Sequence, residues 1–208
     1  MGAALLVAAL YAASPSVAAE EPLFSATVHA LATAIGPVTD SRTAKMPLTI
    51  CMRGDATRID FTGPRGEEAY LLSLAGSQRR WLVNTASELA LPIPGTTTPL
   101  RVDPADPCAA MQASCERGRG DVIAGTLVQG WRYRNTGGRG PDGTERGTLW
   151  VDPVTGLVLG YRGQLSGWPE YREMRALSVS LQPIGPAPFD LPRTLQQVSS
   201  DAREPWGE

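Results

Sequence analysis

The sequence GTLWVDPVTGLVLGYRGQ, at residues 147–164, constrains the fold most, because two strands and their connecting turn are visible in it together. Asp152-Pro153-Val154-Thr155-Gly156 has turn chemistry: proline presets φ, the aspartate bonds the loop backbone, and glycine takes the left-handed position. A loop formed by residues 153–156 predicts Asp152 opposite Leu157 and Trp150 opposite Leu159. One face of the hairpin then carries Trp150, Leu157, Leu159 and Tyr161, and the other carries Leu149, Val151 and Val158.

Both faces of this predicted hairpin are largely apolar. An antiparallel hairpin with one face in water alternates apolar and polar residues along each strand. We therefore expect both sides of the sheet to be covered. A curved sheet that packs helices or a ligand on its concave side meets this requirement.

A second hairpin is predicted around Gly54-Asp55, a two-residue turn of the type that needs positive φ. Its register places Ile50 opposite Ile59 and Leu48 opposite Phe61, so that the apolar residues share one face. Further short strands are expected at residues 69–74, 80–84, 88–93, 121–134 and 173–181. Residues 23–31 favour a strand over a helix, because apolar and polar residues alternate there.

The first 19 residues have the pattern of a secretory signal. Residues 1–19 contain no charge, residues 3–13 are nearly all apolar, and small residues precede Glu20. This predicts cleavage before Glu20, since the apolar run is shorter than the ~20 residues that span a bilayer. The missing Lys or Arg near Met1 leaves a buried N-terminal helix as the alternative. No cysteine follows the predicted cut, so we expect no lipid anchor there.

Export makes the three cysteines candidates for oxidation. Asp106-Pro107 is a helix-start signal, and a helix from there to about Glu116 would separate the Cα atoms of Cys108 and Cys115 by ~10 Å. A disulfide needs less than ~7 Å. Either the helix breaks or the bond does not form. We expect a Cys108–Cys115 bond that closes a compact loop, with Cys51 left as a buried free thiol.

No pattern for catalysis or for cofactor binding is present. A serine hydrolase needs a G-x-S-x-G turn and a histidine, whereas the one histidine, His29, lies in a predicted strand. No paired C-x-x-C or phosphate-binding glycine motif occurs, so we expect no metal, no cofactor and no catalytic residue. The net charge of -2 is too small to indicate a nucleic-acid partner.

Several motifs together resemble the LolA-like superfamily of outer-membrane lipoprotein carriers, within a group of exported proteins without an assigned activity. They are the predicted signal, GDATRIDF at residues 54–61, the insert at 107–115, GTLWVDPVTGLVL at 147–159 and APFDLP at 187–192. The resemblance implies a mainly β (α+β) fold: one curved antiparallel sheet forming a half-barrel, with short helical segments on its concave side. The predicted organisation is a signal at 1–19, this domain at 20–192 and a polar tail at 193–208.

The resemblance also implies a concave face that holds acyl chains or similar ligands. We predict a soluble, monomeric, periplasmic protein without enzymatic activity and without a transmembrane segment after signal removal, which binds an apolar or lipid-like ligand such as the acyl chains of a lipoprotein. The alternative is an envelope module that fills its own cavity and binds a protein partner through an edge strand. The predicted ligand contacts are Trp131, Tyr133, Trp150, Leu159 and Tyr161, although core packing explains each of them singly.

Overall fold

The computed structural model describes residues 23–33, 45–63, 66–77, 80–93, 99–167, 170–192 and 195–197. The predicted signal and nearly all of the predicted tail lie outside these ranges. The described chain forms one open sheet of 13 strands, antiparallel except for the pairing of β13 with β6. The strands are β1 (Ser25–Thr33), β2 (Lys45–Arg53), β3 (Ala56–Thr62), β4 (Glu68–Ser73), β5 (Arg80–Asn84), β6 (Leu89–Ile93), β7 (Ser114–Arg117), β8 (Asp121–Ile123), β9 (Thr126–Arg134), β10 (Arg146–Val151), β11 (Val158–Gln164), β12 (Tyr171–Ser180) and β13 (Gln196–Gln197).

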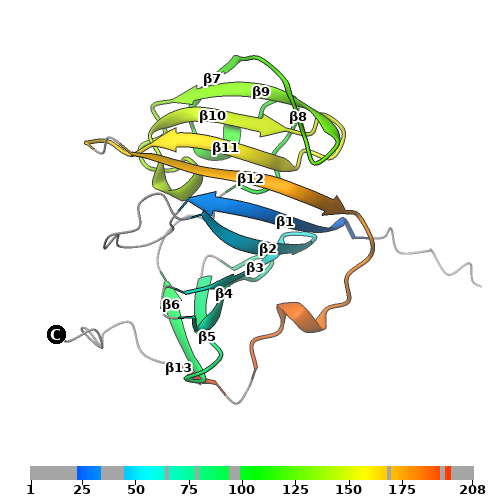
Figure 1. Cartoon of the computed structure of the whole chain (residues 1–208), viewed down its shortest axis with the longest axis vertical. Helices are drawn as coiled ribbons and strands as arrows, with labels where there is room; N and C mark the ends of the chain where they lie inside the picture. The colour runs from blue at the N-terminus through cyan, green and yellow to red at the C-terminus, as the bar shows by residue number, and fades with distance from the viewer. Residues whose placement is uncertain are drawn as a thin grey trace, which may run out of the picture.

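The spatial order of the strands is β13-β6-β5-β4-β3-β2-β1-β12-β11-β10-β9-β7, with β8 paired to β9 outside this path. Figure 1 shows β7 and β9–β12 running across the top of the view and β5 and β6 running steeply at the bottom, so the sheet is strongly twisted. β1 pairs with β12, which places the first strand beside the last long one. The two hairpin regions therefore join at the middle of the sheet.

The predicted Gly54-Asp55 hairpin is confirmed in every predicted pair. Ile50 lies opposite Ile59, and Leu48 lies opposite Phe61. Gly54 has φ 55°, as the turn chemistry requires. β1 confirms the predicted first strand, and its alternating residues Ala26, Val28, Ala30 and Ala32 are buried.

The register predicted for the β10–β11 hairpin is confirmed at the turn and wrong beyond it. The amide of Asp152 donates to the carbonyl of Leu157 at 2.9 Å, as predicted. Val151 then pairs with Val158, but Trp150 pairs with Gly160, so that Leu159 is the extra residue of a β-bulge. A bulge shifts every later pair by one residue and thereby exchanges the faces. Trp150 therefore lies on the face opposite to Tyr161, which pairs with Leu149.

Of the two alternatives for the segment between Asp106 and Glu116, the continuous helix does not form. Only a three-residue 3₁₀ helix, η1 (Ala109–Met111), forms there, and β7 begins at Ser114. The predicted Cys108–Cys115 disulfide is present, with a Cα–Cα distance of 5.8 Å that a continuous helix would not allow. Two other 3₁₀ helices, η2 (Pro141–Gly143) and η3 (Ala187–Phe189), complete the helical elements of the described residues.

Two hydrophobic cores lie on opposite faces of the sheet. Cross-strand pairs connect one continuous face, here called the inner face, from Leu91 in β6 to Tyr161 in β11. The larger core lies mainly on the inner face of β1, β2 and β9–β12, includes Leu100 and Met111 from the segment before β7, and extends to the outer face at Ile123 and the half-buried Trp150. The smaller core lies on the outer face of β3–β6 under η3, and its buried members are Ala56, Tyr70, Leu72, Val83, Ala90 and Phe189.

Candidate functional site

A row of apolar side chains crosses the inner face of β3–β6. Ile59 pairs with Leu71, Leu71 with Leu82, and Leu82 with Leu91, one residue from each of four adjacent strands. We call these four residues the inner ladder. All four are half-buried, whereas the same face in β1 and β2 is fully buried at Val28 and Ile50.

The inner ladder is the less protected side of these strands. On their outer face Leu72 and Val83 are 0% exposed, because the closing segment around η3 packs over them. Ile59 touches the larger core, but Leu71, Leu82 and Leu91 belong to neither core formed by the described residues. A row of partly exposed apolar side chains beside a packed core is a candidate binding face.

Arg80 lies on the same face, two residues before Leu82 at the start of β5. Its Nε is buried and has no hydrogen-bond partner among the described residues. Burial lowers the pKa of Arg80, and the nearby carboxylate of Asp142 acts in the opposite direction. A half-buried guanidinium with an unused donor is suited to an anionic or carbonyl group of a ligand.

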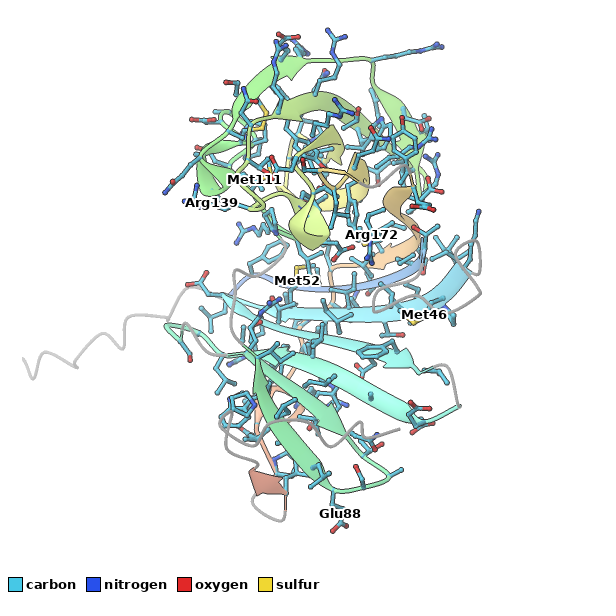
Figure 2. The ribbon with its side chains drawn as sticks, turned by 90° about the vertical axis from the view of Figure 1, so that its left-hand side faces the viewer. Met46, Met52, Glu88, Met111, Arg139 and Arg172 are labelled. Atoms are coloured by element: carbon cyan, nitrogen blue, oxygen red, sulfur yellow. A yellow bond between two sulfur atoms is a disulfide. The ribbon has the colours of Figure 1, made fainter. Side chains whose placement is uncertain are left out.

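Asp142 belongs to a polar cluster in η2 and the neighbouring strands. The hydroxyl of Tyr161 donates to Oδ2 of Asp142, a residue in the left-handed conformation with φ 52°. Burial, reinforced by the Asp142 carboxylate, raises the pKa of Tyr161 well above its ordinary value. Figure 2 shows Arg172, whose charge lowers that pKa in part, lying with Met52 between the upper strands and β4–β6.

A second tyrosine is anchored beside this cluster. Thr144 Oγ1 donates to the carbonyl of Pro141 at 2.7 Å, so the hydroxyl of Tyr133 is the donor in its 2.6 Å bond to Thr144 Oγ1. Burial raises the pKa of Tyr133 to about 12. These bonds fasten η2 to β9 and β11, so η2 forms a fixed polar boundary on the inner face.

The structure brings together only part of the predicted ligand site. Tyr133, Leu159 and Tyr161 are 1–2% exposed in the larger core, and Trp131 is half-buried against it. Trp150 is half-buried on the outer face, so the prediction that it shares a face with Leu159 and Tyr161 is wrong. The role of these five residues as ligand contacts stays a prediction.

Sequence reasoning missed the inner ladder. The usable signal is that β4 is apolar on both faces, with Tyr70 and Leu72 on one side and Leu71 on the other. The same pattern recurs in β5, where Leu82 lies between Trp81 and Val83. β4 and β5 therefore have two largely apolar faces, as the hairpin at residues 147–164 does.

Other kinds of site have little support among the described residues. No group of three or more His, Cys, Asp or Glu side chains in this part of the chain is placed to hold a metal ion. None of the described helices has the length and apolar character needed to cross a membrane. His29 is exposed, and its Nδ1 lies 3.2 Å from Thr49 Oγ1, as suits an ordinary residue of a sheet.

The comparisons with known proteins show similarity in fold. No protein-family model and no curated protein matches the chain. An uncharacterised conserved protein from Thermus thermophilus is 8% identical with a TM-score of 0.56, over 84% of this chain and 90% of that one. A putative outer-membrane lipoprotein-sorting protein domain from Vibrio parahaemolyticus is 13% identical with a TM-score of 0.39, over 81% and 89%. A LolA superfamily protein from Nitrosomonas europaea is 10% identical with a TM-score of 0.33, over 82% and 90%. At 8% identity, the similarity to the Thermus thermophilus protein shows the fold alone.

Proposed function

We propose that this protein is an exported, non-enzymatic binding protein that holds an apolar, lipid-like ligand against the inner face of its sheet. The observation that carries the proposal is the inner ladder, a cross-strand row of half-buried apolar side chains beside the packed cores. In the half-barrel form expected from the resemblance, this row would line the concave side.

The two halves of the inner face have different roles in this proposal. Over β9–β12 the protein fills the face with its own side chains, including Leu149 and Met174. Over β3–β6 the ladder supplies the surface for acyl chains. Each buried CH₂ contributes ~0.8 kcal/mol. Arg80 lies beside the ladder, two residues before Leu82 in β5, and would receive the polar end of the ligand.

In this proposal Tyr133 and Tyr161 support the polar boundary at η2 and do not line the surface for the acyl chains. Their hydroxyls hold Thr144 and Asp142 in place, and Asp142 in turn lies near Arg80. Removal of either hydroxyl is expected to change the position of η2 and hence the polar end of the site.

Periplasmic location is part of the proposal and depends on the predicted signal. N-terminal sequencing of protein recovered from the envelope fraction is expected to begin at Glu20. An intact Met1 on material from the cytoplasm would remove the argument for export. The bridged Cys108 and Cys115 support an oxidising compartment.

Binding is tested with purified mature protein in two steps. Mass spectrometry of an organic extract is expected to show co-purifying lipid, and a fluorescent fatty-acid analogue is expected to bind saturably. Leu82→Gln places an amide in the ladder and is expected to weaken analogue binding about tenfold or more, from the lost burial of one leucine. Leu177→Gln is the matched control, because Leu177 is 58% exposed on β12.

Two outcomes would count against this proposal. A folded Leu82→Gln protein with unchanged binding would contradict the location on the ladder while leaving ligand binding intact. Absence of both co-purifying lipid and analogue binding would contradict the proposed function and favour the alternative, an interaction module with a self-filled interior. Circular dichroism of each variant establishes that the sheet is intact.

A further inference from the structure

The outer face of β9–β11 carries a depression with a volume of about 590 Å³. Its lining includes four arginines, which come from β9, β10 and β11, and a single acidic residue, Glu116. The ligand-binding sites of small molecules have volumes of ~300–1,000 Å³. The whole chain has a net charge of -2, so this local excess of positive charge does not follow from composition.

Thr148 lies at the centre of this arginine group. It pairs with Arg132 of β9 on one side and with Arg162 of β11 on the other. Arg146 precedes it by two residues in β10 and therefore points to the same face, as does Trp150 two residues after it. Side chains that pair directly across strands have Cβ atoms about 5 Å apart, and those two positions apart along a strand about 7 Å. The Cβ atoms of three arginines and of Trp150 thus lie around that of Thr148.

Neighbouring groups leave part of this charge uncompensated. Glu116 accepts hydrogen bonds from both Arg132, at 3.3 Å, and Arg134. Arg146 lies directly opposite Arg134, and its Nε donates to the neutral amide oxygen of Gln164 at 3.3 Å. Like charges directly opposite each other across strands are destabilising. The arrangement therefore gains from a bound anion.

The orientation of Arg162 is set by its surroundings. Its guanidinium carbon lies 4.0 Å above the centre of the Tyr171 ring, and its Nε lies 3.9 Å from a carboxylate oxygen of Glu173. Stacking on an aromatic ring leaves the in-plane N–H donors of the guanidinium available. This arginine is thus held in place before any ligand arrives.

We propose that this depression binds a phosphate or sulfate monoester of a small organic molecule. The oxyanion would lie over Thr148 among Arg132, Arg146 and Arg162, because arginine forks match phosphate and sulfate oxygens in pairs of hydrogen bonds. The organic part would contact Trp150. This site is on the opposite face of the sheet from the inner ladder and does not depend on lipid binding there.

Titration calorimetry with para-nitrophenyl phosphate, para-nitrophenyl sulfate and inorganic phosphate tests the proposal. Saturable binding of the monoesters is expected, with competition by inorganic phosphate. Arg146→Gln and Thr148→Val are expected to weaken it, the arginine variant about tenfold or more, since hydrogen bonds to charged groups are the strong ones. The matched control is Arg175→Gln, which removes one positive charge from the same face but in an ion pair with Asp121 at 2.9 Å.

The control variant distinguishes a specific site from general electrostatic attraction to positive charge. If Arg175→Gln weakens binding as much as Arg146→Gln, the attraction is unspecific and the proposal is wrong. Phosphatidylcholine vesicles with and without phosphatidic acid distinguish the source of the anion. Binding to the phosphatidic acid vesicles alone, lost in Arg146→Gln and Thr148→Val, would support a lipid headgroup as the monoester. Absence of saturable binding both to the soluble monoesters and to the phosphatidic acid vesicles would overturn the proposal.

Discussion

Trp150 lies opposite Gly160 across β10 and β11, whereas the length of the loop alone predicts Leu159 as its partner. The bulge sends the indole to the outer face and leaves Tyr161 on the inner face. A Cβ on Gly160 would lie 3.1 Å from Cδ1 of Ile123 and 3.5 Å from Cε3 of Trp150. The two aromatic side chains therefore serve different surfaces of one hairpin.

This separation predicts the behaviour of Trp150→Ala. Binding of a fatty-acid analogue to the inner ladder is expected to stay within about twofold of the unchanged protein, because Trp150 is on the other face, while monoester binding weakens. The free energy of unfolding is expected to fall by ~1–3 kcal/mol from the lost packing of a half-buried indole. Analogue titrations and urea unfolding measure the two effects. A selective loss of analogue binding in a stably folded variant would contradict the location of Trp150.

Gly163→Ala is expected to destabilise the fold. The added Cβ would lie 2.2 Å from the hydroxyl of Tyr133 and 2.8 Å from Thr144 Oγ1, so the hydroxyl bond at the polar boundary would have to break. Overpacking of this kind costs ~1–3 kcal/mol. Gly185→Ala is the control, because its Cβ would meet nothing within 4 Å and its φ is not positive. Urea midpoints of the two variants should differ; equal midpoints would contradict the contact.

The buried Tyr133 predicts a loss of stability in alkali. Its folded pKa is raised to about 12, above the value of ~10 expected in the unfolded chain. Between these values the unfolded chain has lost the proton while the folded one keeps it. The stabilisation is therefore complete below pH ~10 and is lost progressively as the pH rises towards ~12. Urea unfolding at several pH values measures the slope, which Tyr133→Phe should reduce; an unchanged slope would contradict the burial of this hydroxyl.

The thiol chemistry provides a further prediction. A peptide map without reductant is expected to show Cys108 linked to Cys115 and Cys51 free. Burial raises the pKa of Cys51, so its thiol should react slowly with disulfide reagents near neutral pH until the protein unfolds. Replacing both bridged cysteines by serine is expected to cost about 2.5 kcal/mol by the loop-entropy relation. Linkage of Cys51 to either partner would contradict the arrangement.

Turn chemistry predicted the register of one hairpin fully and of the other only at its turn. The Gly54-Asp55 loop fixes the pairs that follow because β2 and β3 continue without interruption. In β11 the loop again fixes the first pair, but the bulge at Leu159 depends on packing around Gly160, which lies outside the turn. Local sequence therefore determines where pairing begins, and tertiary packing determines whether it continues.

Tertiary constraints also explain the other differences between the expectations from the sequence and the structure. Asp106-Pro107 is a good helix start, but the constraint between Cys108 and Cys115 outweighs helix propensity over so short a segment. Leu177, which alternates with Val179 in the sequence, is 58% exposed, and the β1–β12 register shifts beside it. Cys51 was expected to be buried and is half-buried, since it faces the smaller core under the closing segment.

The two edges of the sheet have features that affect whether a further strand can pair with them. At one end β7 has only four residues, mostly exposed, and Cys115 ties it back to Cys108. At the other end the returning chain places β13 in parallel along β6, where Pro92 lacks an amide hydrogen. Short, tethered or occupied edges resist the addition of a foreign strand. A sheet this wide thus has short or occupied edges at both ends, which favours recognition of a protein partner through side chains on its faces.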